Sequence, residues 1–445
     1  MKLKHLAYFI VVITSISSLP AHALDLLQSL KLAQENDTVL QAARAEYLAS
    51  IESESQSTAA LLPNLSLNFF TQKNSTETTN STGSFTDSSS DFSSNGYKIS
   101  LTQTLYNQQL FDAMDASEAT GAQALAQYEA AKQTLILRLA QAYFSVLAAQ
   151  DNVAFAEAEK KANKRLLKQN QERFKVGLIA ITDVKEAQAK YDSAIAQAIV
   201  ASNELSNQHE ALWFIISQRP ESLNKLQDSI ALNFPELNDI KDWQDNALSN
   251  NLLLRAANYA MQAAKENYDL QHAGHYPTLS LNAQHSSTSA EGSTLGFGGR
   301  DIDDTVIGLS LDIPIYSGGY TSSKTRQAVA ELDQAKRLLE KQQRQTIQDM
   351  RTAYLGVQAS IAQVEAFKQV LISTESATEA TQLGFEVGTR TSVDVLLAQG
   401  NLFKSQRDYA KARYDSILKL LELKYAAGLL SAVDIQHINQ WLSPS

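Results

Sequence analysis

Cysteine is absent from this sequence of 445 residues. Without it the chain can form no disulfide scaffold, thiolate metal site or cysteine nucleophile, and no lipid can be attached to an N-terminal cysteine. Basic charge is also scarce, since 38 Lys and Arg residues face 48 Asp and Glu residues for a formal net charge of −10. A surface that binds phosphate groups needs the opposite sign, so we expect no nucleic acid partner.

Prolines and long apolar runs are equally scarce. The 7 prolines leave residues 64–219 and 315–443 without any, whereas domains built of short elements are punctuated more often. This spacing predicts long uninterrupted elements. The longest apolar block after the N-terminus covers residues 211–216, far below the roughly 18 residues of a spanning helix. If the mature chain spans a membrane, it has to use a closed β-barrel, because an open sheet leaves backbone groups unpaired in lipid.

Residues 1–23 have the pattern of a secretory signal peptide. Lys2 and Lys4 precede an apolar run over residues 6–13, and residues 21–23 place alanines where a signal peptidase cleaves. The alternative, an N-terminal transmembrane anchor, fails because a spanning helix needs roughly 20 apolar residues. We expect a mature chain that starts at Leu24 and keeps 422 of the 445 residues. Its formal net charge is −12, because two lysines are removed.

The rest of the chain follows one plan twice. Residues 142–146 and 174–177 recur with similar sequence 211 positions later, and other matches follow in the same order at offsets of 210 to 214. We interpret the mature chain as a tandem duplication. The first repeat covers residues 24–230 and the second covers residues 231–445.

Alternating apolar and polar residues in each repeat predict β-hairpins over residues 64–106 and 277–316. Polar stretches over residues 71–95 and 286–304 are interpreted as exposed hairpin loops. Strands of about 9–11 residues with one apolar face suit a transmembrane hairpin, and a soluble hairpin with one buried face explains the pattern as well. The apolar positions are Leu65, Leu67, Phe69, Ile99, Leu101, Leu105, Leu279, Leu281, Ala283, Ile307, Leu309, Leu311, Ile313 and Ile315.

Long helical hairpins are predicted after the strands, over residues 107–218 and 317–428. Apolar residues recur there at steps of three and four, as in a coiled-coil seam, around Tyr143 and Tyr354. The first arm of each hairpin has roughly 60 residues, which gives a helix of about 100 Å.

A shorter helical run precedes each strand pair, over residues 25–61 and 242–272. Four strands cannot close a barrel, so the chain has to oligomerise to remove its sheet edges. The helices have the same need, because we expect no globular core to cover their apolar faces.

Several stretches of the chain resemble a known family. They are residues 134–137, 142–147, 173–178, 180–184, 311–319 and 387–395, which include a V-G-x…D-V pattern after both long helices. By these motifs the chain is identified as a member of the TolC family of outer-membrane efflux and secretion channels. The resemblance covers essentially the whole mature chain. The lipid-anchored channels of antibiotic-efflux operons begin with an acylated cysteine, which this sequence lacks.

The resemblance implies a mainly α fold with a β part, in which identical chains form a homotrimer. Antiparallel coiled-coil hairpins form a trimeric α-barrel, and four strands per protomer contribute to a 12-stranded transmembrane β-barrel in the lipid of the outer membrane. Such a channel exports small toxic compounds or secreted proteins. It docks on a periplasmic membrane-fusion adaptor and an inner-membrane pump of the RND, ABC or MFS class. It has no catalytic activity, and no cofactor is implied.

The resemblance also places a gate at the periplasmic tip, held by polar links between helices. Arg390 matches the gate arginine of the family, and Asp183 matches its aspartate partner from the first repeat. Phe385 stands where the family has a tyrosine that also binds this aspartate, so a hydrogen bond worth roughly 0.5–1.5 kcal/mol is missing. Asp394 matches one of two aspartates at the constriction, and Leu397 replaces the other.

Three copies of Asp394 in a trimer would form a ring of carboxylates, which selects cations. Simpler interpretations stay open: Asp394 and Asp183 can cap their helices, and Arg390 can be a solvated charge. The glycines of the two turns can simply provide positive φ. The resemblance implies that the adaptor contacts these turns at Gly177, Leu178, Gly388 and Thr389.

Other functions have less support. The sequence contains no P-loop, H-E-x-x-H, G-x-S-x-G or dinucleotide-binding glycine pattern, so we do not expect an enzyme. His272 and His275 have no third ligand nearby, so we expect no metal site. A soluble periplasmic coiled-coil adaptor is the alternative to a channel, but it would carry one long hairpin rather than two.

Overall fold

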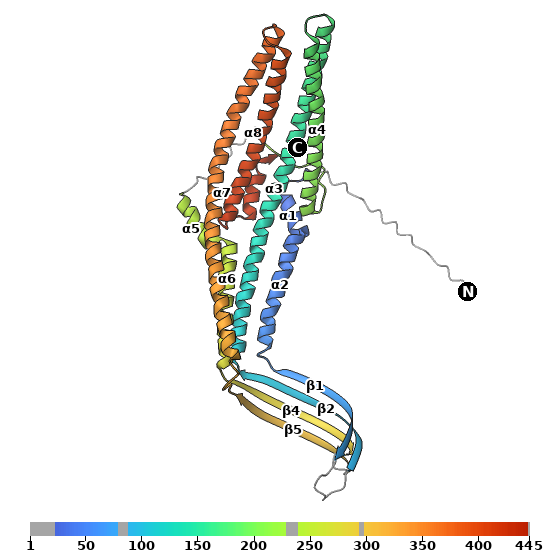
Figure 1. Cartoon of the computed structure of the whole chain (residues 1–445), viewed down its shortest axis with the longest axis vertical. Helices are drawn as coiled ribbons and strands as arrows, with labels where there is room; N and C mark the ends of the chain where they lie inside the picture. Colours follow the sequence, from blue (N-terminus) through green and yellow to red (C-terminus); the bar gives the residue numbers. More distant parts are fainter. Residues whose placement is uncertain (1–22, 79–87, 228–238, 293–297, 444–445) are drawn as a thin grey trace, which may run out of the picture.

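The computed structural model describes four stretches of the chain, residues 23–78, 88–227, 239–292 and 298–443. The protomer is elongated, with a four-stranded sheet at one end and the tips of two helical hairpins at the other (Figure 1). The predicted signal peptide lies outside the described residues except for Ala23. The predicted boundary after residue 230 lies outside them too, so the division into two repeats at that point stays a prediction.

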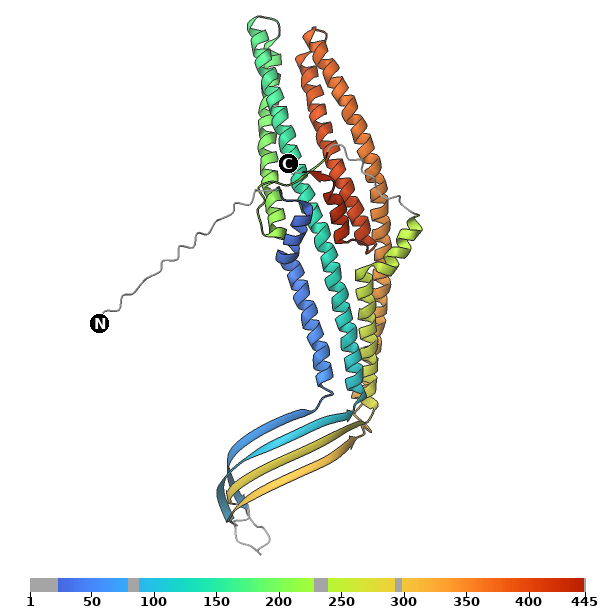
Figure 2. The ribbon, with the colours of Figure 1, turned by 180° about the vertical axis from the view of Figure 1, so that it is seen from behind.

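Two helical hairpins provide most of the length. α3 (Gln108–Lys175) and α4 (Ile181–Ile216) form the first, and α7 (Tyr320–Glu386) and α8 (Ser392–Ala426) form the second. α3 has 68 residues and α7 has 67, so each is about 100 Å long. Seen from behind, both tips again point away from the sheet (Figure 2). The predicted fold of long antiparallel helical hairpins with four strands is confirmed.

The four long strands form one antiparallel sheet in the order β1-β2-β4-β5. Each β-hairpin comes from one half of the chain, and the two hairpins join where β2 pairs with β4. Within the described residues, no further strand pairs with the outer edges of β1 and β5. The strand bounds are β1 (Asn64–Thr78), β2 (Ser88–Tyr106), β4 (Thr278–Gly292) and β5 (Gly298–Asp312).

The strands are longer than the sequence analysis indicated. Residues 71–78 and 88–95 were expected in a loop but continue the ladder of β1 and β2. Residues 286–292 and 298–304 do the same in β4 and β5. The other expected loop residues lie outside the described part of the chain. The strands extend this far because pairing with a neighbouring strand stabilises Ser- and Thr-rich segments that show no apolar alternation of their own.

Each helical run before the strands consists of two helices rather than the single one expected. Asp37 separates the first pair and Asn251 the second, with extended ψ values of 115° and 121°. Each side chain accepts a hydrogen bond from the backbone three residues later, as an N-cap does. The helices are α1 (Leu26–Asn36), α2 (Thr38–Ala59), α5 (Ile240–Asn250) and α6 (Leu252–His272).

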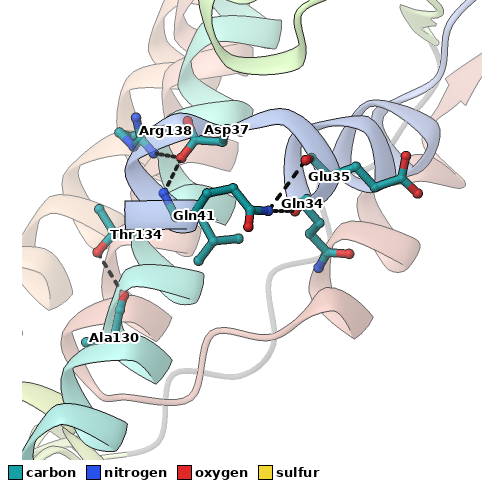
Figure 3. Close-up of polar contacts among 8 residues, drawn as sticks. Gln34, Glu35, Asp37, Gln41, Ala130, Thr134 and Arg138 are labelled. Carbon is teal, nitrogen blue, oxygen red and sulfur yellow. Dashed lines mark hydrogen bonds and ion pairs between the residues drawn. The ribbon is translucent and has the colours of Figure 1, made fainter. Parts of the chain in front are cut away.

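The break at Asp37 is buried and charged. Its Oδ1 accepts a hydrogen bond from Leu40 N at 2.7 Å. A terminal nitrogen of Arg138 on α3 donates to the same oxygen at 2.9 Å (Figure 3). The Asp37 side chain is 1% exposed and that of Arg138 is 29% exposed. Removing one partner of such a pair leaves a buried charge without compensation. The pair therefore holds the start of α2 against the middle of α3.

A hydrophobic core lies midway along the protomer. It combines residues of α1, α3, α4 and α8 with α9 (Ala432–Asn439) and a small sheet of β3 (Lys225–Leu226) and β6 (Leu442–Ser443). Tyr143 is fully buried there, and its hydroxyl lies 3.0 Å from each of two main-chain carbonyl oxygens. Burial raises the pKa of this hydroxyl, so it stays a hydrogen-bond donor. The expectation that no globular core covers the helices is therefore wrong for their middle section.

We expect Asp37→Ala to destabilise the protein more than Asn251→Ala, its counterpart in the second half. Loss of an N-cap costs about 1 kcal/mol at either site. At Asp37 the change also leaves Arg138 without its carboxylate, so the free energy of unfolding falls by about 2–4 kcal/mol in total. Thermal unfolding in detergent, followed by circular dichroism, compares the two variants. Equal losses would show that the Asp37–Arg138 pair adds no more than the hydrogen bond from Asn251 Nδ2 to the carbonyl oxygen of Ala426, which the control also loses.

Candidate functional site

The tip of the first hairpin is a glycine turn followed by a capped helix. Gly177 has a φ of 75°, which glycine adopts without strain, and Leu178 N donates to the carbonyl oxygen of Arg173 at 2.9 Å. Asp183, in the first turn of α4, accepts a hydrogen bond from Ala180 N at 3.2 Å. Within one protomer, Asp183 thus helps to cap its own helix.

The second tip repeats this turn with a complete cap. Gly388 has a φ of 83°, and Thr389 N donates to the carbonyl oxygen of Gly384 at 2.8 Å. Asp394 accepts hydrogen bonds from Thr391 N at 2.9 Å and from Thr391 Oγ1 at 3.0 Å. In return, Asp394 N donates to Thr391 Oγ1 at 3.2 Å. This reciprocal arrangement is a capping box and fixes the start of α8.

The capping box keeps Asp394 charged. Hydrogen bonds from the Thr391 backbone and then from its hydroxyl lower the pKa of Asp394, and Arg390 adds a smaller electrostatic contribution. A lowered carboxyl pKa stabilises the fold above the ordinary value of 3.8, and this contribution is lost as pH falls through the lower value of the folded state. The carboxylate of Asp394 is therefore ionised at neutral and mildly acidic pH.

Arg390 and Asp183 are not paired within the protomer. Arg390 is exposed, and no ion pair joins it to Asp183 in the part of the chain that the structure describes. The Arg390 side chain lies along α7, where a Cβ added to Gly384 would be 2.8 Å from Arg390 Cγ. A link between Arg390 and Asp183 stays a prediction. It would have to join Arg390 of one chain to Asp183 of a neighbouring chain.

Phe385 and Leu397 have contrasting surroundings. The Phe385 side chain is 3% exposed, whereas Leu397 is 55% exposed and lines a cavity between α4 and α8. The ring of Phe385 thus fills a socket in the hydrophobic cluster of the tip rather than merely lacking a hydroxyl. The other buried members of this cluster are Leu166, Leu167, Ala187, Val395 and Leu396.

Two residues at the tips, Arg173 and Asn170, make contacts that were not predicted from the sequence. The guanidinium carbon of Arg173 lies 4.3 Å from the centre of the Phe385 ring, which is a cation–π contact. Asn170 is fully buried and donates from Nδ2 to the carbonyl oxygen of Asp183 at 3.2 Å. For Arg173, comparing the two halves of the sequence could have indicated a special role. Its counterpart 211 positions later is Gly384, although the phenylalanine that follows is the same in both halves.

At the opposite end of the protomer, one face of the sheet is apolar. The register pairs Leu65 with Leu101 and Ala283 with Ile307, so odd-numbered residues of all four strands share this face. Its side chains on the outer strands are largely exposed in the protomer. They include Leu65, Leu67, Phe69, Ile307, Leu309 and Leu311.

The apolar face ends at a row of polar and aromatic side chains. Tyr97 lies beside Phe69, and its hydroxyl is 3.5 Å from Nε2 of His285. His285 Nδ1 lies 2.9 Å from Thr305 Oγ1 on β5. Farther from the helices, the same face carries Ser, Thr and charged residues. The apolar part of the sheet therefore forms a band of limited height.

In the described residues, no group of three or more His, Asp or Glu side chains is placed to hold a metal ion. His272 and His275 instead belong to a ring cluster, with the His272 ring 6.1 Å from that of Tyr268 and 5.7 Å from that of Tyr276. Over the same parts of the chain, no helix is long and apolar enough to cross a membrane.

The sequence profile of a family described as "Outer membrane efflux protein" matches residues 29–217 and 243–429. The chain belongs to this family. Outer membrane protein TolC of Vibrio cholerae serotype O1 is 37% identical to it over 411 residues, which cover 92% of each chain. Alkaline protease secretion protein AprF of Pseudomonas aeruginosa is 28% identical, and the match covers 94% of this chain and 87% of AprF.

Solved structures of outer membrane channels share the fold. The CmeC channel of Campylobacter jejuni superposes with a TM-score of 0.80 and 16% identity, covering 99% of this chain and 97% of CmeC. The channel OprN superposes with a TM-score of 0.78 and 17% identity, covering 91% of this chain and 89% of OprN.

Membership of the outer membrane efflux protein family decides between the two functions considered from the sequence, a channel and a soluble adaptor. The chain is an outer-membrane efflux or secretion channel that extends into the periplasm, which confirms the predicted localisation. The expectation that it is not an enzyme is confirmed as well. The soluble adaptor alternative is set aside, because TolC from two species is an outer membrane protein.

We expect Leu309→Arg to prevent insertion of this efflux protein into the outer membrane, and Ser310→Arg to be tolerated. Leu309 lies in the middle of the apolar band on β5, and Ser310 is the next residue on the opposite face. An arginine on a lipid-facing strand costs about 2–4 kcal/mol near the bilayer midplane. Immunoblots of outer-membrane fractions compare the two variants. Equal amounts of both in the membrane would contradict the assignment of the faces.

Proposed function

We propose that three copies of this chain form one channel-tunnel, with the strands closed into a barrel in the outer membrane and the helices forming a periplasmic tunnel. This proposal is carried by the outer edges of β1 and β5, with which no other strand of the described residues pairs. Pairing β1 of one chain with β5 of the next removes both edges, and three copies of four strands give an even-numbered barrel of twelve.

The two faces of the sheet support the same assembly. The apolar side of the band would face lipid. The even-numbered residues on the other face include Asn68, Lys98 and Gln284, which suit a water-filled interior. The helices would continue this passage, because α3 and α7 run from the sheet to the tips (Figure 1).

Small toxic compounds, secreted proteins, or both are the proposed cargo. Secretion of an alkaline protease is named for AprF, and secretion of proteases for PrtF of Dickeya chrysanthemi, which is 26% identical over 443 residues. Efflux is named for the family itself. A passage lined by ordinary polar side chains has few specific contacts with its cargo, which is compatible with either kind.

The hairpin tips are the proposed contact for a periplasmic membrane-fusion adaptor. Val176, Leu178 and Val387 are 70%, 72% and 77% exposed in the protomer. Apolar side chains around Gly177, Gly388 and Thr389 would be covered by the tip of a partner protein. An inner-membrane pump of the RND, ABC or MFS class would drive transport through this adaptor, since the chain has no energy-converting motif of its own.

An iris-like gate is proposed at the same tips. In a trimer, three copies of Asp394 would give a ring of carboxylates that attracts cations. Arg390 would bind Asp183 of a neighbouring chain and hold the tips together in the closed state. Arg390 is exposed near its tip and Asp183 is half-buried near the other, so both can be reached by a second copy.

Planar-bilayer recordings test the channel directly. The full-length protein is extracted from the outer membrane and added to one side of the bilayer. Discrete conductance steps support the proposal. A correctly folded protein that never conducts overturns it. A deletion strain identifies the class of cargo. Increased sensitivity to detergents and dyes indicates efflux, and loss of a type I secreted protein indicates secretion.

We expect Asp394→Ala to weaken block of the channel by multivalent cations added from the periplasmic side. Three carboxylates are lost at once in the trimer, so a fall of about tenfold or more in blocker affinity is expected. Asp192→Ala, farther along the first hairpin, is the matched control and should leave the block unchanged. Identical block in the wild type and Asp394→Ala would show that Asp394 does not face the pore.

We expect Arg390→Ser to raise the resting conductance, because the proposed links between neighbouring chains are lost. Exposed ion pairs are weak, typically 0–1 kcal/mol each, so a rise of about two- to fivefold is expected. Arg326→Ser, near the other end of α7, controls for the loss of one positive charge per chain. A resting conductance equal to that of the wild type would contradict the role of Arg390.

A further inference from the structure

We propose that Phe385 and Arg173 form a latch that holds the second hairpin of each protomer against the first and keeps the tunnel closed. This inference rests on the proposed function, because it assigns the gate two further positioning residues. It differs from the proposed Arg390–Asp183 link in location and in kind. The latch lies inside one protomer and works mainly by apolar burial.

The contacts of Phe385 join the two hairpins. Phe385 is the last buried residue of α7, and its ring is 3% exposed close to a tip whose other apolar side chains are largely exposed. It belongs to one hydrophobic cluster with Leu166 and Leu167 of α3, Ala187 of α4, and Val395 and Leu396 of α8, and this cluster is the socket of the ring. Moving the second hairpin away from the first at this level would divide the cluster between the two hairpins.

Arg173 covers the socket from the first hairpin. Its guanidinium carbon lies 4.3 Å from the centre of the ring, and the side chain is half-buried. Arg173 is one of two basic residues in the last turn of α3, and the other, Lys175, pairs with Glu172. Arg173 is thus the cation of this turn that stacks on the second hairpin, and the contact adds to the apolar burial.

The internal duplication shows that this arrangement is specific to one hairpin. Phe174 is the counterpart of Phe385 at the offset of 211, but it is 42% exposed and belongs to none of the hydrophobic clusters of the described chain. The counterpart of Arg173 is Gly384, and a side chain there would clash with Arg390. The equivalent turns therefore differ: the second hairpin provides the buried ring of Phe385, and the first provides Arg173, which stacks on it.

The chemistry of the latch predicts how it responds to salt. Exposed ion pairs are screened as ionic strength rises, whereas burial of an aromatic ring is not. A gate held only by Arg390 and Asp183 would loosen in concentrated salt. A gate that also contains the Phe385 latch would stay closed there, because the ring remains in its socket.

Single-channel recording of the full-length trimer tests the latch, with Phe385→Ala compared with Phe174→Ala. We expect Phe385→Ala to raise the fraction of time in the open level by about tenfold or more, since truncating a buried phenylalanine is among the costliest core substitutions. Phe174→Ala should behave like the wild type. The increase should persist at high salt when each variant is compared with the wild type under the same conditions.

Arg173→Gln and Phe385→Leu separate the two parts of the latch and keep the test valid if Phe385→Ala does not assemble. Each removes the cation–π contact while an apolar side chain still fills the socket, so we expect an increase of about two- to fivefold. Arg165→Gln, two turns earlier on α3, is the control for lost charge. Wild-type gating in both Arg173→Gln and Phe385→Leu would overturn the latch.

The latch and the proposed function fail in different ways. If the wild type forms no channels, the proposed function fails. If the wild type and Phe174→Ala conduct normally, and Phe385→Ala assembles but opens no more often than they do, only the latch fails.

Discussion

The packing of α3 against its neighbours is the interaction on which the rest of the protomer depends. This single helix contacts α2, α4, α6 and α8, and so joins both hairpins to the helices that lead into the sheet.

The buried side chains of α3 change in size along its length. Small residues near the sheet, including Gly121, allow several helices to approach closely. In the middle, Tyr143 and Phe144 fill the space where α1, α9 and the small sheet join the core. Toward the tip, Leu166 and Leu167 leave room for the ring of Phe385.

This arrangement leaves the two ends of the protomer suited to different surroundings. The sheet presents an apolar band that ends at Tyr97 and His285, so one end matches a layer of lipid of limited height. The tips present glycine turns, charged caps and a few exposed apolar side chains, which suit water and protein partners. Neither end is complete in one chain, because in the described residues the outer edges of the sheet are unpaired and no ion pair joins Arg390 to Asp183.

Much of the fold follows from the sequence because its causes are local or periodic. The steps of three and four around Tyr143 and Tyr354, the glycines after α3 and α7, and the alternation in β1 and β5 each act within a few residues. Features that depend on distant partners were missed. The helix breaks at Asp37 and Asn251 need α3 and α8 beside them, since Asp37 binds Arg138 and Asn251 Nδ2 donates to the carbonyl oxygen of Ala426.

The candidate site, too, has features that could be predicted from the sequence and others that could not. The caps at Asp183 and Asp394 and the positive φ of Gly177 and Gly388 were anticipated, because caps and turns have local signatures. The socket of Phe385 was not, because it includes Leu166, Leu167 and Ala187 of the first hairpin, which are distant in the sequence. A substitution that looked like the loss of one hydroxyl is instead a ring buried between two hairpins.

In the proposed assembly, three chains close around one passage. Electron cryomicroscopy of the complex extracted from the outer membrane can show whether they do. We expect three copies, a closed ring of twelve strands in which β1 of each chain pairs with β5 of the next, and hairpin tips that converge on a common axis. A particle with another number of chains, or one in which β1 and β5 remain unpaired, would contradict it.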